Sequence, residues 1–180
     1  MVRLRRTSAA LVLALACATA SAQPRDGLSA DAYAVFAKWM TSSCLGSEAR
    51  ALEEGLRRYR VELEPAFRKA LTAGPPPAEL RRVRAAAEGR HAELAKMPLS
   101  DFRIEGISPR LAARGAAAST RESYAADEAL RYANGYRSNA LSGLAVVGGP
   151  EARALLSRMA RRSDALAPAA REGLKTFDRQ

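Results

Sequence analysis

Histidine and cysteine are scarce in this 180-residue sequence, which contains one histidine and two cysteines. A zinc site needs three or four ligands drawn mainly from these two residue types, so no zinc-type ligand set is available. A Ser-His-acid site would need His91 as its base, and no Gly-x-Ser-x-Gly segment is present to hold a serine nucleophile. Cys44 and His91 are the one remaining nucleophile pair, and nothing in the sequence around either residue supports that use.

Phosphate-binding loops and isolated acid pairs are also missing. Gly148-Gly149 lacks the Lys-Ser/Thr that follows the glycines of a phosphate-binding loop. The acidic pairs Glu53-Glu54 and Asp127-Glu128 fall in arginine-rich helical segments, where solvated ion pairs are expected rather than a general acid and base. We therefore expect a protein that is not an enzyme, with no catalytic residue, no metal ligand, no cofactor and no cofactor-binding residue.

Acidic residues are absent from the first 22 residues, which carry three arginines and then an uncharged apolar stretch from Ala9 to Ala20. A positive segment, an apolar run and the small-residue site Ala20-Ser21-Ala22, in this order, are typical of a secretory signal peptide. The run is shorter than the roughly 20 apolar residues that a membrane-spanning helix needs. We therefore expect residues 1–22 to be cleaved near Ala22 and the mature chain, starting at Gln23, to be periplasmic or secreted.

The two cysteines leave alternatives open. Cys17 would be the acylated residue of an anchored lipoprotein, although Ala14 stands where such signals usually carry leucine. If residues 1–22 are removed, Cys44 is the only cysteine left, so no disulfide can form within the mature chain. Cys44 either is buried at the end of an apolar helical face, which we expect, or pairs with another molecule.

Basic residues outnumber acidic ones, with 29 Lys and Arg against 19 Asp and Glu. Removing the three arginines of the signal leaves 26 basic residues against the same 19 acidic ones, a net charge of +7. Basic clusters occur at Arg57–Arg60, Arg81–Arg84 and Arg158–Arg162. We interpret them as solvated helix faces, with weak attraction to anionic envelope surfaces as the alternative. Interleaved tyrosines fit nucleic-acid binding, but export argues against it.

Helical spacing of apolar residues recurs along the mature chain, and no segment alternates in the manner of a half-buried strand. The mature chain of about 158 residues has the length of one domain and retains no apolar run that could span a membrane. We therefore predict an all-α fold of antiparallel helical hairpins. In the first part of the chain, helices are predicted over residues 30–44, from the Ser47 cap to the break at Gly74–Pro77 with a kink or restart at Pro65, and over residues 77–96. In the second part, one helix is predicted from the Ser119–Glu122 capping box to Asn134-Gly135 and another from there to Gly148. The last two begin at Pro150 and at Leu166, and the final helix extends to Phe177.

The predicted helices have apolar faces. Before the connector, these faces carry Val35, Phe36, Trp39 and Met40; Leu52, Leu56, Tyr59 and Leu63; Phe67, Ala70 and Leu71; and Leu80, Val83, Ala87 and Leu94. After it, the faces of the last three helices carry Ala140, Leu141, Leu144 and Val147; Ala152, Leu155, Leu156 and Met159; and Leu174 and Phe177. His91 lies near the face of the predicted helix over 77–96, as a packed or rim residue. The signal weakens over 97–118, so we predict an N-terminal helical half (23–96), a connector (97–118) and a C-terminal helical half (119–180).

A short internal repeat marks the C-terminal half. Ala140-Leu141-Ser142-Gly143-Leu144 recurs as Ala170-Arg171-Glu172-Gly173-Leu174, thirty residues later, with a Gly-Gly-Pro-Glu-Ala corner between the copies. A hairpin of this kind buries its face only by stacking on another. On these features, residues 137–177 resemble the short bacterial HEAT-like repeats. The resemblance implies an α-solenoid-like fold or a right-angle helical bundle with an interaction surface, and it implies no reaction.

Together these features predict an exported, non-catalytic helical-repeat protein that serves as a protein-interaction or scaffold module in the cell envelope, with another envelope protein as its partner. The alternative is an envelope enzyme or a small-ligand-binding protein with a pocket between the two helical halves. Buried polar residues converging near Cys44 and His91 would favour that alternative, and a continuous concave surface would favour the interaction module.

Overall fold

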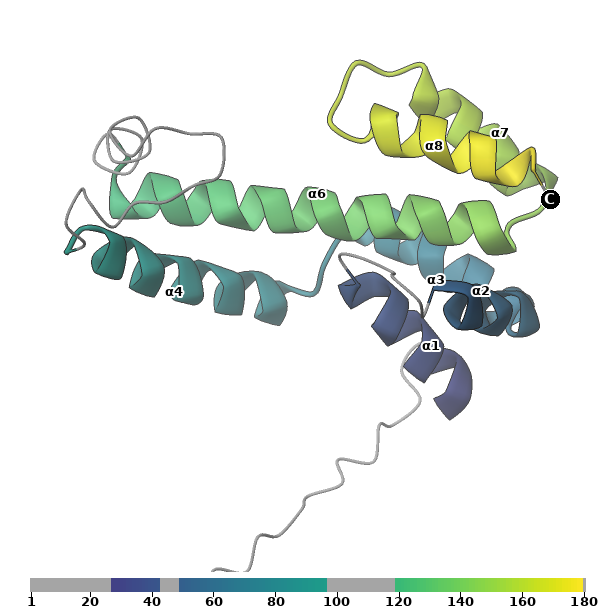
Figure 1. Cartoon of the computed structure of the whole chain (residues 1–180), viewed down its shortest axis with the longest axis horizontal. Coiled ribbons are helices and arrows are strands. Elements are labelled where there is room, and N and C mark those ends of the chain that lie inside the picture. The colour runs from purple at the N-terminus through teal and green to yellow at the C-terminus, as the bar shows by residue number, and fades with distance from the viewer. Residues whose placement is uncertain (1–26, 43–48, 97–118, 180) are drawn as a thin grey trace, which may run out of the picture.

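The computed structural model describes residues 27–42, 49–96 and 119–179, which form seven helices and no strand (Figure 1). In chain order the helices are α1 (Ala30–Thr41), α2 (Ala49–Arg58), α3 (Arg60–Ala73), α4 (Pro77–Leu94), α6 (Arg121–Val147), α7 (Pro150–Ala160) and α8 (Ala167–Phe177). The predicted all-α fold is confirmed. The predicted signal peptide and connector, the two cysteines Cys17 and Cys44, and the predicted Ser47 cap lie outside the described residues.

Helix α6 is the central element of the fold. It has 27 residues, which corresponds to a length of about 40 Å. Its C-terminal half lies between α1, α2 and α3 on one side and α7 and α8 on the other (Figure 1). Every residue from Gly143 to Val147 is buried there. One hydrophobic core therefore contains residues from both predicted halves of the chain.

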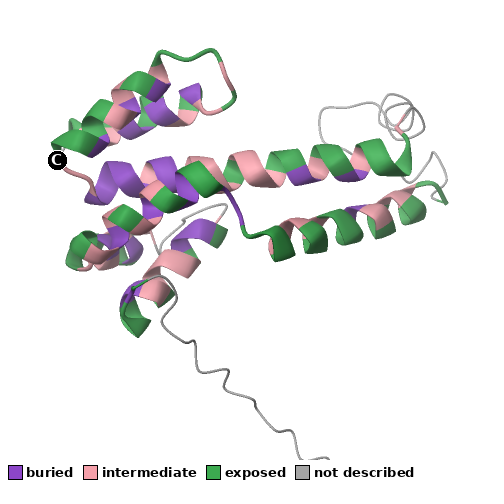
Figure 2. Cartoon of the chain, turned by 180° about the vertical axis from the view of Figure 1, so that it is seen from behind, coloured by how far each residue is buried: buried purple, intermediate pink, exposed green. Residues whose placement is uncertain are grey.

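The N-terminal half of α6 pairs with α4 to form a two-helix arm that extends away from this core (Figure 2). Because α4 packs extensively along α6 alone, it buries little: Ala87 is its one fully buried residue among those described. The predicted inward residues Leu80, Val83 and Leu94 are half-buried. The predicted face of this helix is thus correct, but it covers a single neighbouring helix.

The predicted end of a helix at Asn134-Gly135 is wrong, because α6 continues through both residues. Glycine weakens a helix interior by roughly 0.5–1 kcal/mol relative to alanine, which tertiary contacts can offset. On the arm, Tyr132 donates a hydrogen bond to Glu79 of α4 at 2.8 Å, and its ring packs against Tyr136. These contacts support the helix on both sides of Gly135.

The predicted interruption of the second helix lies at a different residue. The break falls at Tyr59, between α2 and α3, and Pro65 lies inside α3 without ending it. Proline removes the amide that would bond the carbonyl four residues earlier, here Val61. The Val61 residue is 82% exposed, so water can reach this part of the helix. The apolar stripe continues across the break, with Leu56 and Leu63 fully buried.

Two predicted helix ends also shift. The first helix ends at Thr41 rather than at residue 44. Near this end, the side-chain amide of Asn139 in α6 donates a hydrogen bond to the Met40 carbonyl at 3.0 Å. The N-cap of α6 is Thr120, whose hydroxyl accepts from the Ser123 amide at 3.1 Å. The predicted capping box placed the cap one residue earlier, so Glu122 does not occupy the third helical position.

A close approach between α3 and α6 organises the core. The Phe67 ring is fully buried, packs against the Phe36 ring with 5.1 Å between centroids, and lies directly over Gly143. A Cβ atom at Gly143 would overlap the Phe67 ring. Glycine at this position therefore lets the two helices come together.

The thirty-residue repeat places small residues at helix contacts. Ala140 and Ala170 are both fully buried, and a Cβ at Gly173 would meet Leu156 at 3.1 Å, just as one at Gly143 would meet Phe67. The leucines differ: Leu144 is fully buried, whereas Leu174 is half-buried. Leu174 nevertheless packs against the same core, so both leucines face it at different depths.

We predict that Gly143→Ala destabilises the protein by about 1–3 kcal/mol, since the added methyl forces the Phe67 ring out of its site. Gly135→Ala in the same helix is the matched control, because a Cβ there meets nothing within 4 Å. That change should stabilise by roughly 0.5–1 kcal/mol through helix propensity. Denaturant unfolding of both variants tests the packing and the continuity of α6, and a loss of stability in Gly135→Ala would contradict an uninterrupted helix.

The arm predicts a pH dependence at the alkaline end. Burial, and then the hydrogen bond to the Glu79 carboxylate, raise the pKa of Tyr132 to about 12. A phenol in the unfolded chain has a pKa of about 10, so the folded state retains this proton longer. The contribution of the protonated Tyr132 phenol to the free energy of unfolding is fully present below about pH 10 and is lost as the pH rises through about 12.

The difference in unfolding free energy between the wild type and Tyr132→Phe should accordingly shrink over this pH window. Glu79→Gln should lower the pKa of Tyr132 and move the transition to lower pH. A pH profile that is the same for the wild type and Tyr132→Phe would contradict the contact.

Candidate functional site

His91, the one histidine that the sequence offers for catalysis, makes contacts within the arm. His91 is half-buried near the end of the arm, where Nε2 lies 3.0 Å from the Ser119 carbonyl oxygen and the ring packs against Tyr124. These contacts join the end of α4 to the start of α6. Among the residues described, no side-chain group of His, Cys, Asp and Glu is placed to hold a metal ion, and no polar or charged residue is buried.

The two carboxylate pairs contribute ion pairs on the surface, as predicted. Glu53 pairs with Arg57 one turn away at 3.2 Å. Glu128 accepts from Arg90 of α4 at 3.1 Å and from Arg131 at 2.9 Å. Ion pairs at the surface contribute about 0–1 kcal/mol each to the free energy of unfolding, so these pairs stabilise the helices only slightly.

The three basic clusters lie on different parts of the molecule. Arg57–Arg60 spans the α2–α3 break, and Arg81–Arg84 lies on the arm. In the third cluster, Arg158 and Arg162 share a groove with Arg68 of α3 and Arg137 of α6. No sequence pattern groups Arg68 and Arg137 with the third cluster, since they lie 90 and 21 residues before Arg158.

This groove runs between α3 and α7 and has a volume of about 720 Å³. Apolar side chains form part of its lining: Leu71, Leu155, Met159 and Leu166. A second cleft of about 440 Å³ shares Arg68 and Arg158 with it and adds Arg161, Glu151 and Ser157 to the lining. The two clefts are thus neighbours along α7, and together we call them the arginine groove.

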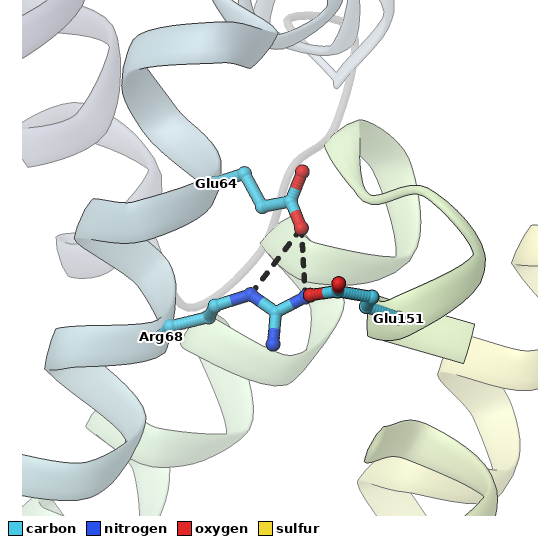
Figure 3. Close-up of polar contacts among 3 residues, drawn as sticks. All are labelled: Glu64, Arg68 and Glu151. Carbon is cyan, nitrogen blue, oxygen red and sulfur yellow. Dashed lines mark hydrogen bonds and ion pairs between the residues drawn. The ribbon is translucent and has the colours of Figure 1, made fainter. Parts of the chain in front are cut away.

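Arg68 bridges the groove (Figure 3). Its Nε and Nη2 donate to Glu64 Oε1, one turn earlier in α3, at 3.2 and 2.8 Å. Nη2 also donates to Glu151 Oε2, at the start of α7, at 3.4 Å. Glu151 is 88% exposed, so this second interaction is weak and readily exchanged for another carboxylate.

Arg137 is held by the end of α3. Its Nε donates to the Leu71 carbonyl at 3.3 Å, and carbonyls at the end of a helix carry partial negative charge. Gly74 follows with a φ of 74° and a ψ of −167°, a conformation that essentially only glycine adopts. A Cβ at Gly74 would approach Arg137 Nη2 to 2.7 Å. The glycine therefore both ends α3 and leaves room for the guanidinium.

The remaining arginines give the groove a surplus of positive charge. Arg162 pairs with Asp164 at 2.7 Å. Arg158 and Arg161 are exposed, and within the described part of the chain neither has a carboxylate at ion-pair distance. The groove thus has five arginines in its lining, against three carboxylates: Glu64, Glu151 and Asp164. Such a surface can bind a group that is partly anionic and partly apolar.

Protein-family models, curated proteins and solved structures contain no match for this chain. The resemblance of residues 137–177 to HEAT-like repeats accordingly stays a prediction from the sequence. None of the described helices combines the length and the apolar character needed to cross a bilayer.

We predict that Gly74→Ala destabilises the protein by about 1–3 kcal/mol, because alanine at a φ of 74° is strained and its methyl displaces Arg137. In an Arg137→Ala background the loss should be smaller but not zero, since the backbone strain remains. Gly89→Ala, on the arm and with nothing within 4 Å of its Cβ, is the control and should stabilise slightly. Equal losses for Gly74→Ala in both backgrounds would contradict the contact with Arg137.

Proposed function

We propose that this chain is an exported, non-catalytic helical protein that serves as a protein-interaction or scaffold module in the cell envelope, with the arginine groove as its contact surface. Export is supported by the three arginines, the apolar stretch and the Ala20-Ser21-Ala22 site at the N-terminus. In the alternative form, a lipoprotein anchored to the membrane through an acylated Cys17, the chain would have the same function at a membrane surface.

The observation that carries the proposal is the combination of an apolar lining and exposed arginines in one open groove. Arginine and methionine are enriched at protein interfaces, where arginine often supplies a large share of the binding energy. Leu155 and Met159 of α7 provide the apolar contact; Arg158 lies on the same helix and Arg162 in the turn after its end.

A small-ligand-binding protein is the second candidate. The groove lies between α3, from the N-terminal half, and α7, from the C-terminal half, and its volume falls in the range of small-molecule sites. Small-molecule sites, however, orient their ligands with a few polar groups in an enclosed pocket. Here the polar groups are exposed arginines in an open groove, which suits a macromolecular surface better.

Photo-cross-linking in living cells tests the proposal. A photo-reactive amino acid at Ser157, inside the groove, should cross-link to a discrete envelope protein, whereas the same group at Ala86, exposed on the arm, should not. The cross-linked chain should begin at Gln23, or at an acylated Cys17 in the lipoprotein form. Cross-links to small molecules alone would favour the second candidate, and a chain that keeps Met1 inside the cell would contradict export.

A further inference from the structure

We infer that the arginine groove binds an acidic segment of its partner protein, in which several carboxylates flank an apolar anchor residue. This inference rests on the proposed function and adds the chemistry of the partner. Three features of the groove support it: where its cations lie, which of them are already paired, and what lies between them.

The cations come from three helices and the turn after α7, and they surround an apolar strip. Arg68 lies on α3, Arg137 on α6 and Arg158 on α7, and Arg162 lies in the turn that follows the end of α7. A ligand with a single anionic head would match one or two of these guanidinium groups. A peptide with several carboxylates can match the whole row.

The internal ion pairs show the geometry that such a carboxylate would take. Glu64 accepts from two nitrogen atoms of Arg68 through one oxygen, and Glu151 reaches the same guanidinium from across the groove. Arg158 presents the same planar group without a carboxylate partner among the described residues. Arginine favours planar, two-pronged contacts with carboxylates, so Arg158 is the principal contact that an acidic segment would make.

The apolar part of the groove lining indicates that the ligand has an apolar group as well as negative charge. Leu71 of α3 and Leu155 and Met159 of α7 lie in the same cleft as the guanidinium groups. Leu71 and Met159 are each only 7% exposed, so the apolar surface that a ligand made only of carboxylates would leave uncovered belongs mainly to the half-buried Leu155 and Leu166. An apolar side chain between two acidic residues would cover them, and the hydrophobic contact would add to the charge pairing.

Selection from a random peptide library displayed on phage, with the purified protein as bait, tests the inference. The double variant R158Q/R162Q is the matched counter-bait, and R81Q/R84Q on the arm is the control that changes the net charge equally. All four arginines are exposed, so both variants should keep the helical circular dichroism and melting behaviour of the wild type.

The selected peptides should be enriched in Asp and Glu around an apolar residue. Their Kd should rise at least about tenfold in R158Q/R162Q, in line with the loss of charge-assisted hydrogen bonds, and stay within about twofold in R81Q/R84Q. The inference is overturned if no peptide is selected, if the peptides lack acidic enrichment, or if the two variants weaken binding equally. Binding to phosphatidylglycerol vesicles that R158Q/R162Q abolishes, without peptide binding, would assign the groove to a lipid surface and would also overturn it.

The cross-linking experiment separates this inference from the proposed function. If Ser157 still captures the same envelope protein when Arg158 and Arg162 are replaced, the interaction module stands and the acidic partner segment does not. If capture is lost together with peptide binding, both stand.

Discussion

The contact between Phe67 and Gly143 is the interaction on which the rest of the structure depends. It brings α3 against the C-terminal half of α6, with the Phe67 ring lying directly over Gly143. On another side of the same stretch, Gly173 lets α8 approach α6 near Ala145, and α7 packs on α8. Because α6 has small residues at both contacts, helices from either half of the chain share one core. Without such close contacts, α3 and α7 would not lie near enough to enclose a groove.

The groove is a consequence of this packing, and its charge follows from which side chains are left at its edges. Arg68 and Arg137 are fixed by acceptors in α3, namely Glu64 and the Leu71 carbonyl. Arg158, on the opposite wall, has no such acceptor among the described residues. Two cations with defined positions therefore face one that is available to a ligand. Long-range attraction of acidic partners would add to this local recognition, and it would weaken as salt is raised.

Much of the fold can be predicted from the sequence because it depends on local patterns. Periodicity predicts the apolar stripe that contains Leu144. The conformational preferences of glycine and proline predict the breaks at Gly74 and at the Gly-Gly-Pro corner. The continuity of α6 through Gly135 was missed, because contacts with α4 outweigh the propensity of one glycine. The groove could not be predicted as a site, since the ion pair between Arg68 and Glu151 joins residues 83 positions apart. The sequence marked Arg158 as part of a basic cluster, but only the packing shows its neighbours.

The central claim is that α6 holds α3 and α7 at one fixed separation, so that the groove exists before any partner binds. Double electron–electron resonance between spin labels at Val61 of α3 and Arg153 of α7, both exposed and outside the groove lining, measures this separation in the protein without a ligand. The labels would be attached to cysteines at these two positions in a Cys44→Ser background. The account predicts a single narrow distance distribution that is unchanged when a selected peptide binds. A broad or two-component distribution that narrows only with peptide would contradict a preformed groove.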